Sequence, residues 1–257
     1  THRRLVVESR VENREKIDVL NVLVNKMVDT NKKNILGVIP ARGGSKGVKK
    51  KNIRMVGGKP LISYTIESLR QCSMVDNFIT STDSDEIASV AESYGCRVVK
   101  RPHELAKDET PTVPVIAHAL SVLERETSFD YVAVLQPTTP LRSAEDIDLS
   151  LQNLIQSGVD STVSVYKVED HHPARMYRLV QNRLIPFAEE PVDRQRHSLS
   201  EVYHRNGAVY ACKRTLINRG VLYEDDILPY VMPKERSVNI DDELDLAFTD
   251  FLFKSKL

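Results

Sequence analysis

The sequence predicts an α/β fold in which helices cover a mostly parallel sheet. From residue 35 onward, short apolar runs alternate with helix-periodic stretches, the pattern of strands and crossover helices in such folds. The first apolar run, 35–39, is followed at once by a polar run rich in glycine. With 257 residues, 41% of them hydrophobic, the chain can bury the core of one large domain, or of one domain with an insertion.

The predicted strands are short, and helical stretches separate most of them. We expect strands at residues 35–39, 78–81, 97–99, 131–135, 162–166 and 207–212. Ile62, Ile66 and Leu69 fall on one helical face and predict a helix over 60–72. A similar apolar stripe predicts a second helix over 113–123.

Capping signals mark further helices. Asp83 followed by Glu86 resembles a capping pair, and Gly95 would close the helix that it opens. Ser143, with Asp146 three residues on, predicts another helix start. The apolar face of the last predicted helix consists of Leu244, Ala247, Phe248, Phe251 and Leu252.

Two segments stand outside this alternation. Between about residues 168 and 203 the chain is polar and rich in Arg and His, with few helix or strand signals, so we interpret it as an excursion from the core. Residues 1–33 carry one short amphipathic stretch, and their acidic residues argue against an organelle transit peptide. We expect them to be an N-terminal extension, either the tail of a preceding domain or an appended segment. The folded domain is then 34–257.

Composition excludes several classes of function. Lys and Arg total 36 against 36 Asp and Glu, so no basic excess favours nucleic acid as a partner. Three cysteines without CxxC spacing argue against a disulfide framework and a zinc site. No apolar run approaches the roughly 20 residues that span a bilayer. A protein of the cytoplasm, away from membranes, is expected.

The polar run at 40–52 is a candidate phosphate-binding loop. It lies at the carboxyl end of the first strand, where open α/β sheets form their ligand crevice and where glycines let backbone N–H groups approach phosphate. Arg42, Lys46 and Lys51 would neutralise a triphosphate. The spacing fits neither the P-loop nor the dinucleotide fingerprint. The alternative interpretation is a solvated basic turn.

The motifs resemble those of one family. Ala-Arg-Gly-Gly-Ser-Lys-Gly at 41–47, followed by Lys51 and Asn52, is similar to the nucleotide-binding signature of the CMP-sialic acid synthetases, or acylneuraminate cytidylyltransferases. Later segments follow the family pattern in the same order, so the resemblance covers nearly all of 34–257. These segments are 81–88, 101–108, 135–142, 169–175 and 203–210.

The resemblance implies a fold, an activity and an assembly. The fold would be a GT-A-like doubly wound, mostly parallel sheet, with a dimerisation arm inserted at about 168–203. The activity would be the coupling of CTP to a nine-carbon acylneuraminate-type ulosonic acid, giving a CMP-sugar and pyrophosphate. The partners would be these two substrates and a second copy of the chain, and the site would straddle both copies.

Site residues carry over position by position. Arg42, Lys46 and Lys51 would act catalytically. CTP would be bound by Arg42, Gly43, Ser45, Asn52, Arg101 and Thr112. The sugar would be bound by Gln136, Arg175, Arg196, Asn206, Tyr210 and Tyr223. Leu222 stands where the family places an aromatic residue.

Two interpretations compete for Asp83, for Tyr210 and for the pair His171 and His172. Asp83 is expected to be a helix cap rather than a catalytic acid. Tyr210 would otherwise pack beneath the sheet. The adjacent His171 and His172 suggest a metal site, but no third ligand lies at recognisable spacing.

The magnesium motif departs from the family pattern. Nucleotidyl transfer needs a cation to offset phosphate charge, and Mg²⁺ takes one or two carboxylates plus phosphate and water oxygens. The family has Asp-Ile-Asp, whereas this chain has Asn239-Ile240-Asp241. We expect Asp241 to be the main Mg²⁺ ligand, with Asn239 offering a carbonyl oxygen or holding a ligated water. The alternative is that the acids at 241–243 only stabilise the first turn of the next helix.

The motifs leave two questions of function open. The sugar could be a legionaminic, pseudaminic or deaminated sialic acid, or Kdo. A hypothesis of another class, motivated by Asn239, is a non-catalytic nucleotide-sugar-binding subunit.

Overall fold

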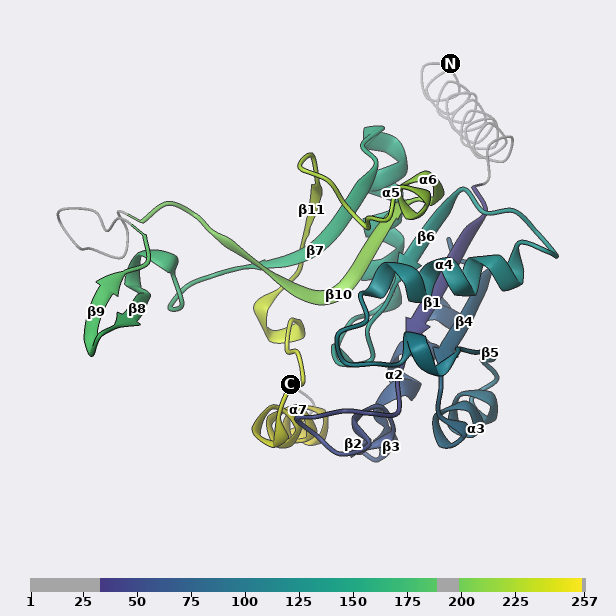
Figure 1. Ribbon diagram of the computed structural model, residues 1–257, viewed down its shortest axis with the longest axis horizontal. Helices are drawn as coiled ribbons and strands as arrows, with labels where there is room; N and C mark the ends of the chain where they lie inside the picture. Colours follow the sequence, from purple (N-terminus) through teal and green to yellow (C-terminus); the bar gives the residue numbers. More distant parts are fainter. Residues whose placement is uncertain (1–32, 189–198, 256–257) are drawn as a thin grey trace, which may run out of the picture. The chain divides into compact units, whose positions relative to one another are not determined.

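A computed structural model describes residues 33–188 and 199–255, so most of the predicted N-terminal extension lies outside the described residues. The described chain from Ile35 onward forms one compact unit. Its centre is a seven-stranded sheet with the strand order β11-β7-β10-β6-β1-β4-β5 (Figure 1). These strands are β1 (Ile35–Pro40), β4 (Asn77–Thr82), β5 (Arg97–Lys100), β6 (Tyr131–Val134), β7 (Ser161–Lys167), β10 (Tyr203–Lys213) and β11 (Leu228–Val231). The six predicted strands are confirmed, and β11 is an addition.

The sheet is parallel except at one strand. β1 pairs in parallel with β4 and β6, β4 with β5, and β7 with β11. β10 is antiparallel to both of its neighbours, β6 and β7. The carboxyl ends of β1, β4, β5 and β6 therefore share one edge, where β10 begins. The predicted mostly parallel α/β class is confirmed.

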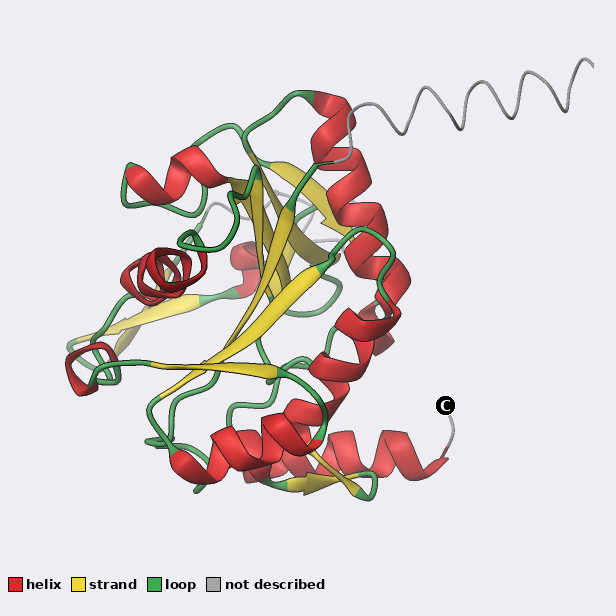
Figure 2. Ribbon diagram, turned by 90° about the vertical axis from the view of Figure 1, so that its right-hand side faces the viewer, coloured by secondary structure: helices red, strands yellow, loops and turns green. Residues whose placement is uncertain are grey.

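Helices cover both faces of this sheet (Figure 2). One face packs against α2 (Leu61–Gln71), α3 (Asp85–Ser93) and α5 (Ala144–Ser157), and the other against α4 (Thr112–Leu123) and α6 (Arg214–Asn218). Alternation along β1 explains the two layers, because Ile35 and Ile39 face the first core while Leu36 and Val38 face the second. Gly37 lets α2 approach closely, since a Cβ there would lie 2.9 Å from a methyl carbon of Leu69.

The helix caps agree with the sequence at one site and differ at another. Ser143 and Asp146 form the predicted capping box at the start of α5. At α3 the capping side chain is Ser84, whose hydroxyl accepts from the Ile87 N–H. The prediction that Asp83 caps this helix is therefore wrong, and its carboxylate is engaged elsewhere.

The last helix, α7 (Glu243–Ser255), is present, but its predicted buried face is wrong. Leu246 and Thr249 are buried, whereas Leu244 and Phe248 are 77% and 51% exposed. Leu246 fills a small apolar cluster with Val48, Val56, Leu61 and Ile240. Because the Asp250 carboxylate also accepts from Gly57 N–H in the hairpin of β2 (Met55–Val56) and β3 (Lys59–Pro60), these contacts, rather than the widest apolar stripe, orient the helix.

The excursion lies between the end of β7 at Lys167 and the start of β10 at Tyr203, as expected. It is less irregular than the sequence indicated, because β8 (Tyr177–Val180) and β9 (Arg183–Pro186) form a hairpin (Figure 1). Gln181 and Asn182 link them with φ values of 47° and 61°, as a type I′ turn requires. Both strands are exposed along their whole length. Among the described residues, no helix combines the length and apolarity needed to cross a membrane.

Candidate active site

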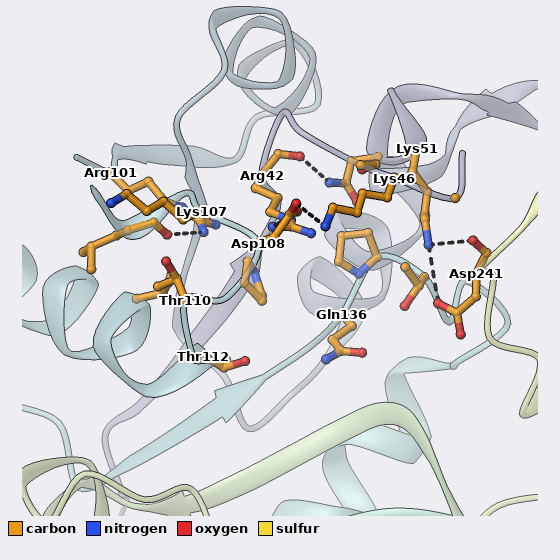
Figure 3. A pocket seen from close by; sticks show the side chains of 18 of the residues that line it. Arg42, Lys46, Lys51, Arg101, Lys107, Asp108, Thr110, Thr112, Gln136 and Asp241 are labelled. Carbon is orange, nitrogen blue, oxygen red and sulfur yellow. Dashed lines mark hydrogen bonds and ion pairs between the residues drawn. The ribbon is translucent and has the colours of Figure 1, made fainter. Parts of the chain in front are cut away.

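A cavity of about 440 Å³ opens at the shared carboxyl edge of the strands (Figure 3). Its walls come from the loop after β1, the segment between β5 and α4, the loop after β6, and the segment before α7. Residues predicted to bind the nucleotide or the metal come from widely separated parts of the sequence and lie together in this cavity. Those lining the cavity are Arg42, Ser45, Lys46, Lys51, Asn52, Arg101, Thr112, Asn239 and Asp241.

The backbone of the glycine loop is held by two polar side chains. The Gly43 N–H donates to an Asp83 carboxylate oxygen at 2.9 Å. The Asn52 side-chain amide donates to the Arg42 carbonyl at 3.0 Å, and Asn52 itself is 7% exposed. Asp83 and Asn52 thus fix the backbone of the loop, and a Cβ at Gly43 would lie 3.0 Å from the Ser84 Cβ. Direct CTP contacts of Gly43 and Asn52 stay predictions.

The loop also touches the proposed metal segment. A Cβ at Gly47 would lie only 2.0 Å from the Asp241 carbonyl oxygen, so no other residue fits there without movement. Lys51 Nζ donates to the Ile240 carbonyl at 2.7 Å and lies 3.4 Å from an Asp241 carboxylate oxygen. The Lys51 side chain is only 12% exposed. The glycine loop and the proposed metal segment are therefore held together by direct contacts.

Cations dominate the rest of the cavity. Arg101 is buried and donates to the carbonyls of Ser81 and Leu105, and burial lowers the pKa of its guanidinium. Arg42 and Lys46 both pair with one carboxylate, that of Asp108, at 2.6 and 2.7 Å. The hydrogen bond from Lys46 is the main cause that lowers the pKa of Asp108. Asp108 belongs to a motif segment, but no sequence signal placed it on these cations.

A second cavity, also about 440 Å³, adjoins the first. Thr112 and Gln136 line both cavities, so they form the junction between them. Two predicted sugar residues, Tyr210 and Tyr223, line the second cavity with stacked rings whose centroids are 6.4 Å apart. Burial raises the pKa of Tyr210. The structure thus places Tyr210 at the cavity wall, whereas the simpler interpretation put it beneath the sheet.

Arg205 is a residue of this second cavity to which the sequence assigned no role. Its guanidinium lies 5.3 Å from the Tyr223 ring centroid and donates to the Tyr223 hydroxyl. It is exposed and has no carboxylate partner among the ion pairs of the described residues. It stands beside Asn206, so its place in the 203–210 motif was the one available signal.

Asn206 lies elsewhere than expected. It is 2% exposed and lines neither cavity. Its side-chain Oδ1 accepts from Ser164 Oγ and the Ala208 N–H, and its side-chain Nδ2 donates to Ser237 Oγ at 2.9 Å. This network joins β7, β10 and the segment before α7. The geometry favours a positioning role, and direct sugar binding by Asn206 stays a prediction.

A buried arginine supports the junction residue Gln136. Arg142 is 2% exposed and donates to the carbonyls of Gln136 and Ala208 at 3.3 and 2.7 Å. It also donates to the Thr65 hydroxyl at 2.7 Å. Burial lowers the pKa of Arg142 to about 9. One side chain therefore ties the loop after β6 to β10 and α2.

Of the two arm residues predicted to bind the sugar, the structure describes only Arg175. Arg175 is exposed and lines neither cavity. Arg196 lies outside the described residues. His172 does not form a metal site with His171, because both of its ring nitrogens already have partners. Its Nδ1 accepts from the Ala174 N–H, and its Nε2 contacts the Ser200 carbonyl oxygen.

The residues at 239 and 241 suit a magnesium ion. The Asn239 side-chain Nδ2 donates to an Asp241 carboxylate oxygen at 2.7 Å, while the Asn239 side-chain Oδ1 is buried without a hydrogen-bond partner. The Asp241 side chain is 75% exposed. Among the described residues, no group of three or more His, Cys, Asp or Glu forms a metal cluster. This sparse oxygen set fits Mg²⁺, which completes its shell with phosphate and water.

Such a geometry defines a class of α/β proteins that bind a phosphorylated ligand at the carboxyl edge of the sheet. Comparison of the sequence with known protein families identifies the particular family. Residues 36–228 match the family model described as cytidylyltransferase, and the chain belongs to the cytidylyltransferase family. The resemblance drawn from the motifs is thereby confirmed.

Two relatives and one solved structure illustrate the relationship. The chain is 36% identical over 220 residues to an N-acylneuraminate cytidylyltransferase of Escherichia coli, covering 84% of this chain and 51% of that protein. It is 32% identical over 226 residues to a CMP-N,N'-diacetyllegionaminic acid synthase of Campylobacter jejuni, covering 86% and 96%. This chain thus spans about half the length of the Escherichia coli relative.

The fold is shared with a CMP:2-keto-3-deoxy-manno-octonic acid synthetase solved in complex with CTP. The TM-score is 0.65 at 17% identity, covering 87% of this chain and 100% of that one. At this identity the likeness concerns the fold alone, and it agrees with the predicted doubly wound sheet.

Proposed function

We propose that the chain transfers CMP from CTP to an acylneuraminate-type nine-carbon ulosonic acid, releasing pyrophosphate. The observation that carries this proposal is the joined pair of cavities, one lined by the cationic glycine loop and the other by Tyr210, Tyr223 and Arg205. Thr112 and Gln136 lie at their junction, where the two substrates would meet. The name of the Escherichia coli relative agrees with this acceptor, and the name of the Campylobacter jejuni relative agrees with transfer of CMP to a related ulosonic acid.

The chemistry would be an in-line displacement. The sugar C2 hydroxyl oxygen bonds to the α-phosphorus, the bond from that phosphorus to the bridging oxygen of the β-phosphate breaks, pyrophosphate leaves, and the hydroxyl proton passes to water. Arg42, Lys46 and Lys51 offset the charge that gathers on the phosphates. Asp241 and Asn239 would hold Mg²⁺, which supplies further positive charge to the phosphate oxygens when it is bound. Positioning and electrostatics then provide most of the rate.

The second cavity supports an acidic sugar as acceptor. The exposed Arg205 guanidinium suits a carboxylate, and Gln136 offers an amide to hydroxyl or acyl groups. Leu222 also lines this cavity, in place of the second aromatic of the family pattern. Legionaminic, pseudaminic and deaminated sialic acids and Kdo share the carboxylate, so they remain the alternative substrates.

The active assembly would be a homodimer in the cytoplasm. The arm exposes apolar side chains, with Leu179 71%, Leu184 65% and Phe187 52% exposed, and a second copy would cover them. Arg175, at the base of this arm, would reach the other copy's sugar cavity. The three cysteines are free and buried, which supports a reducing compartment.

Pyrophosphate release tests the proposal. The full chain is assayed with Mg²⁺, each of CTP, ATP, GTP and UTP, and a panel of ulosonic acids. Release with CTP and one of these sugars is expected, and equal turnover with ATP or GTP would refute the cytidylyl assignment. CTP binding without turnover, restored by Asn239→Asp, would favour the non-catalytic binding subunit instead.

A further inference from the structure

The nucleotide cavity already contains an anion supplied by the protein. One carboxylate oxygen of Asp108 lies 2.6 Å from Arg42 Nη1, and the other lies 2.7 Å from Lys46 Nζ. Figure 3 shows this carboxylate between the two cations, within the ring of cavity side chains. Arg42 and Lys46 come from the loop after β1, whereas Asp108 comes from the segment between β5 and α4. The carboxylate thus lies on two of the cations that would bind phosphate.

The segment that carries Asp108 can leave without uncovering the core. Lys107, Asp108 and Glu109 are all exposed. Their flanks are tied down, because Arg101 donates to the Leu105 carbonyl and the Thr110 hydroxyl donates to the Glu104 carbonyl. A short displacement between these anchors would free both cations.

Carboxylate and phosphate oxygens are equivalent acceptors for Arg and Lys. We propose that Asp108 is an internal competitor for phosphate, a carboxylate that the nucleotide must displace from Arg42 and Lys46. Cytidine without phosphate would gain nothing from this displacement, whereas a triphosphate replaces one carboxylate with several charges. Asp108 would return to the cations as pyrophosphate leaves. The inference rests on the proposed function only in naming CTP as the ligand.

The test compares Asp108→Asn with a matched control by isothermal titration calorimetry of the full chain. The control is Asp160→Asn, since Asp160 also bridges a lysine and an arginine, Lys213 at 2.6 Å and Arg219 at 3.3 Å. It lies at the amino end of β7, on the opposite edge of the sheet. Both changes remove one carboxylate between two cations, from side chains that are 39% and 41% exposed, and Asp108→Ala provides a second variant at the test position.

The ligands are CTP, cytidine and inorganic pyrophosphate. Because exposed ion pairs are weak, Asp108→Asn is expected to bind CTP and pyrophosphate only about three- to tenfold more tightly than the native chain. Cytidine binding should not change, and Asp160→Asn should match the native protein throughout. Unchanged or weaker CTP and pyrophosphate binding by both Asp108 variants would overturn the inference.

Pyrophosphate separates this inference from the proposed function. If the native chain binds no CTP but Asp108→Asn binds pyrophosphate more tightly, the proposed function fails and the inference about Asp108 still holds. If Asp108→Asn does not strengthen pyrophosphate binding, the internal anion is refuted even when CTP turnover is normal. A chain that binds neither ligand would refute both.

Discussion

The contact between Gly47 and Asp241 gives the sharpest structural prediction. In Gly47→Ala the new Cβ would lie 2.0 Å from the Asp241 carbonyl oxygen, whereas real Cβ atoms essentially never approach below 3.0 Å. The loop and the metal segment must therefore separate by at least about 1 Å. Gly47 does not have a positive φ, so crowding is the physical effect of the change.

That displacement sets the expected magnitudes. Overpacking of this kind costs about 1–3 kcal/mol of unfolding free energy, and each kcal/mol lowers Tm by about 2–4 °C in a domain of this size. A reacting group misplaced by about 1 Å can cost about 100-fold in rate. Since Asp241 is the proposed Mg²⁺ ligand, kcat should fall by about that factor, and more Mg²⁺ should be needed.

Gly44→Ala is the control, because it lies in the same loop, its φ is not positive, and a Cβ there would meet nothing within 4 Å. Pyrophosphate release measures kcat at several Mg²⁺ concentrations, and thermal unfolding measures Tm. Gly44→Ala should unfold at the native Tm. Native activity from Gly47→Ala, or an equal loss of Tm in both variants, would refute the reasoning.

Three further predictions concern the metal, the arm and the buried arginine. Asn239→Asp should lower the Mg²⁺ concentration for half-maximal rate, because a second carboxylate adds charge beside Asp241, whereas Asp241→Ala should abolish turnover. A magnesium titration measures both effects, and a native rate from Asp241→Ala would exclude this metal site. Leu179→Asp combined with Leu184→Asp should give monomers with little activity in light scattering and turnover assays, and a fully active dimer would contradict the arm's role. Arg142→Lys should lower the unfolding free energy by about 1–3 kcal/mol in urea denaturation, since buried acceptors lose their donors, and an unchanged value would argue against this anchor.

Local patterns were enough to predict most of the fold. Apolar runs and periodic stripes identified six sheet strands and the main helices because burial on a sheet imposes those periods on the chain itself. The capping box at Ser143 was equally local. The hairpin of β8 and β9 escaped prediction because both of its strands are exposed, so no apolar alternation marks them.

The candidate site was predicted in part. Arg42, Lys46, Lys51 and Asp241 line one cavity, as the motifs implied. Asp83 was misinterpreted because a short acidic residue before a helix looks like a cap, and only tertiary structure brings the Gly43 N–H to it. Asn206 was expected to face the sugar, but its burial depends on strands and segments that meet only in the fold.

By itself, the sequence determined the α/β class, the glycine loop after the first strand, and the family to which the chain belongs. These depend on residues close together in the chain, where spacing and composition act directly. Only the tertiary structure decided that β10 runs antiparallel, that α7 buries Leu246 rather than Phe248, and that Asp108 lies between Arg42 and Lys46. Each of these features depends on contacts between residues that are far apart in the sequence. Burial of apolar side chains and pairing of charges determine which contacts form once the sheet has brought those residues together.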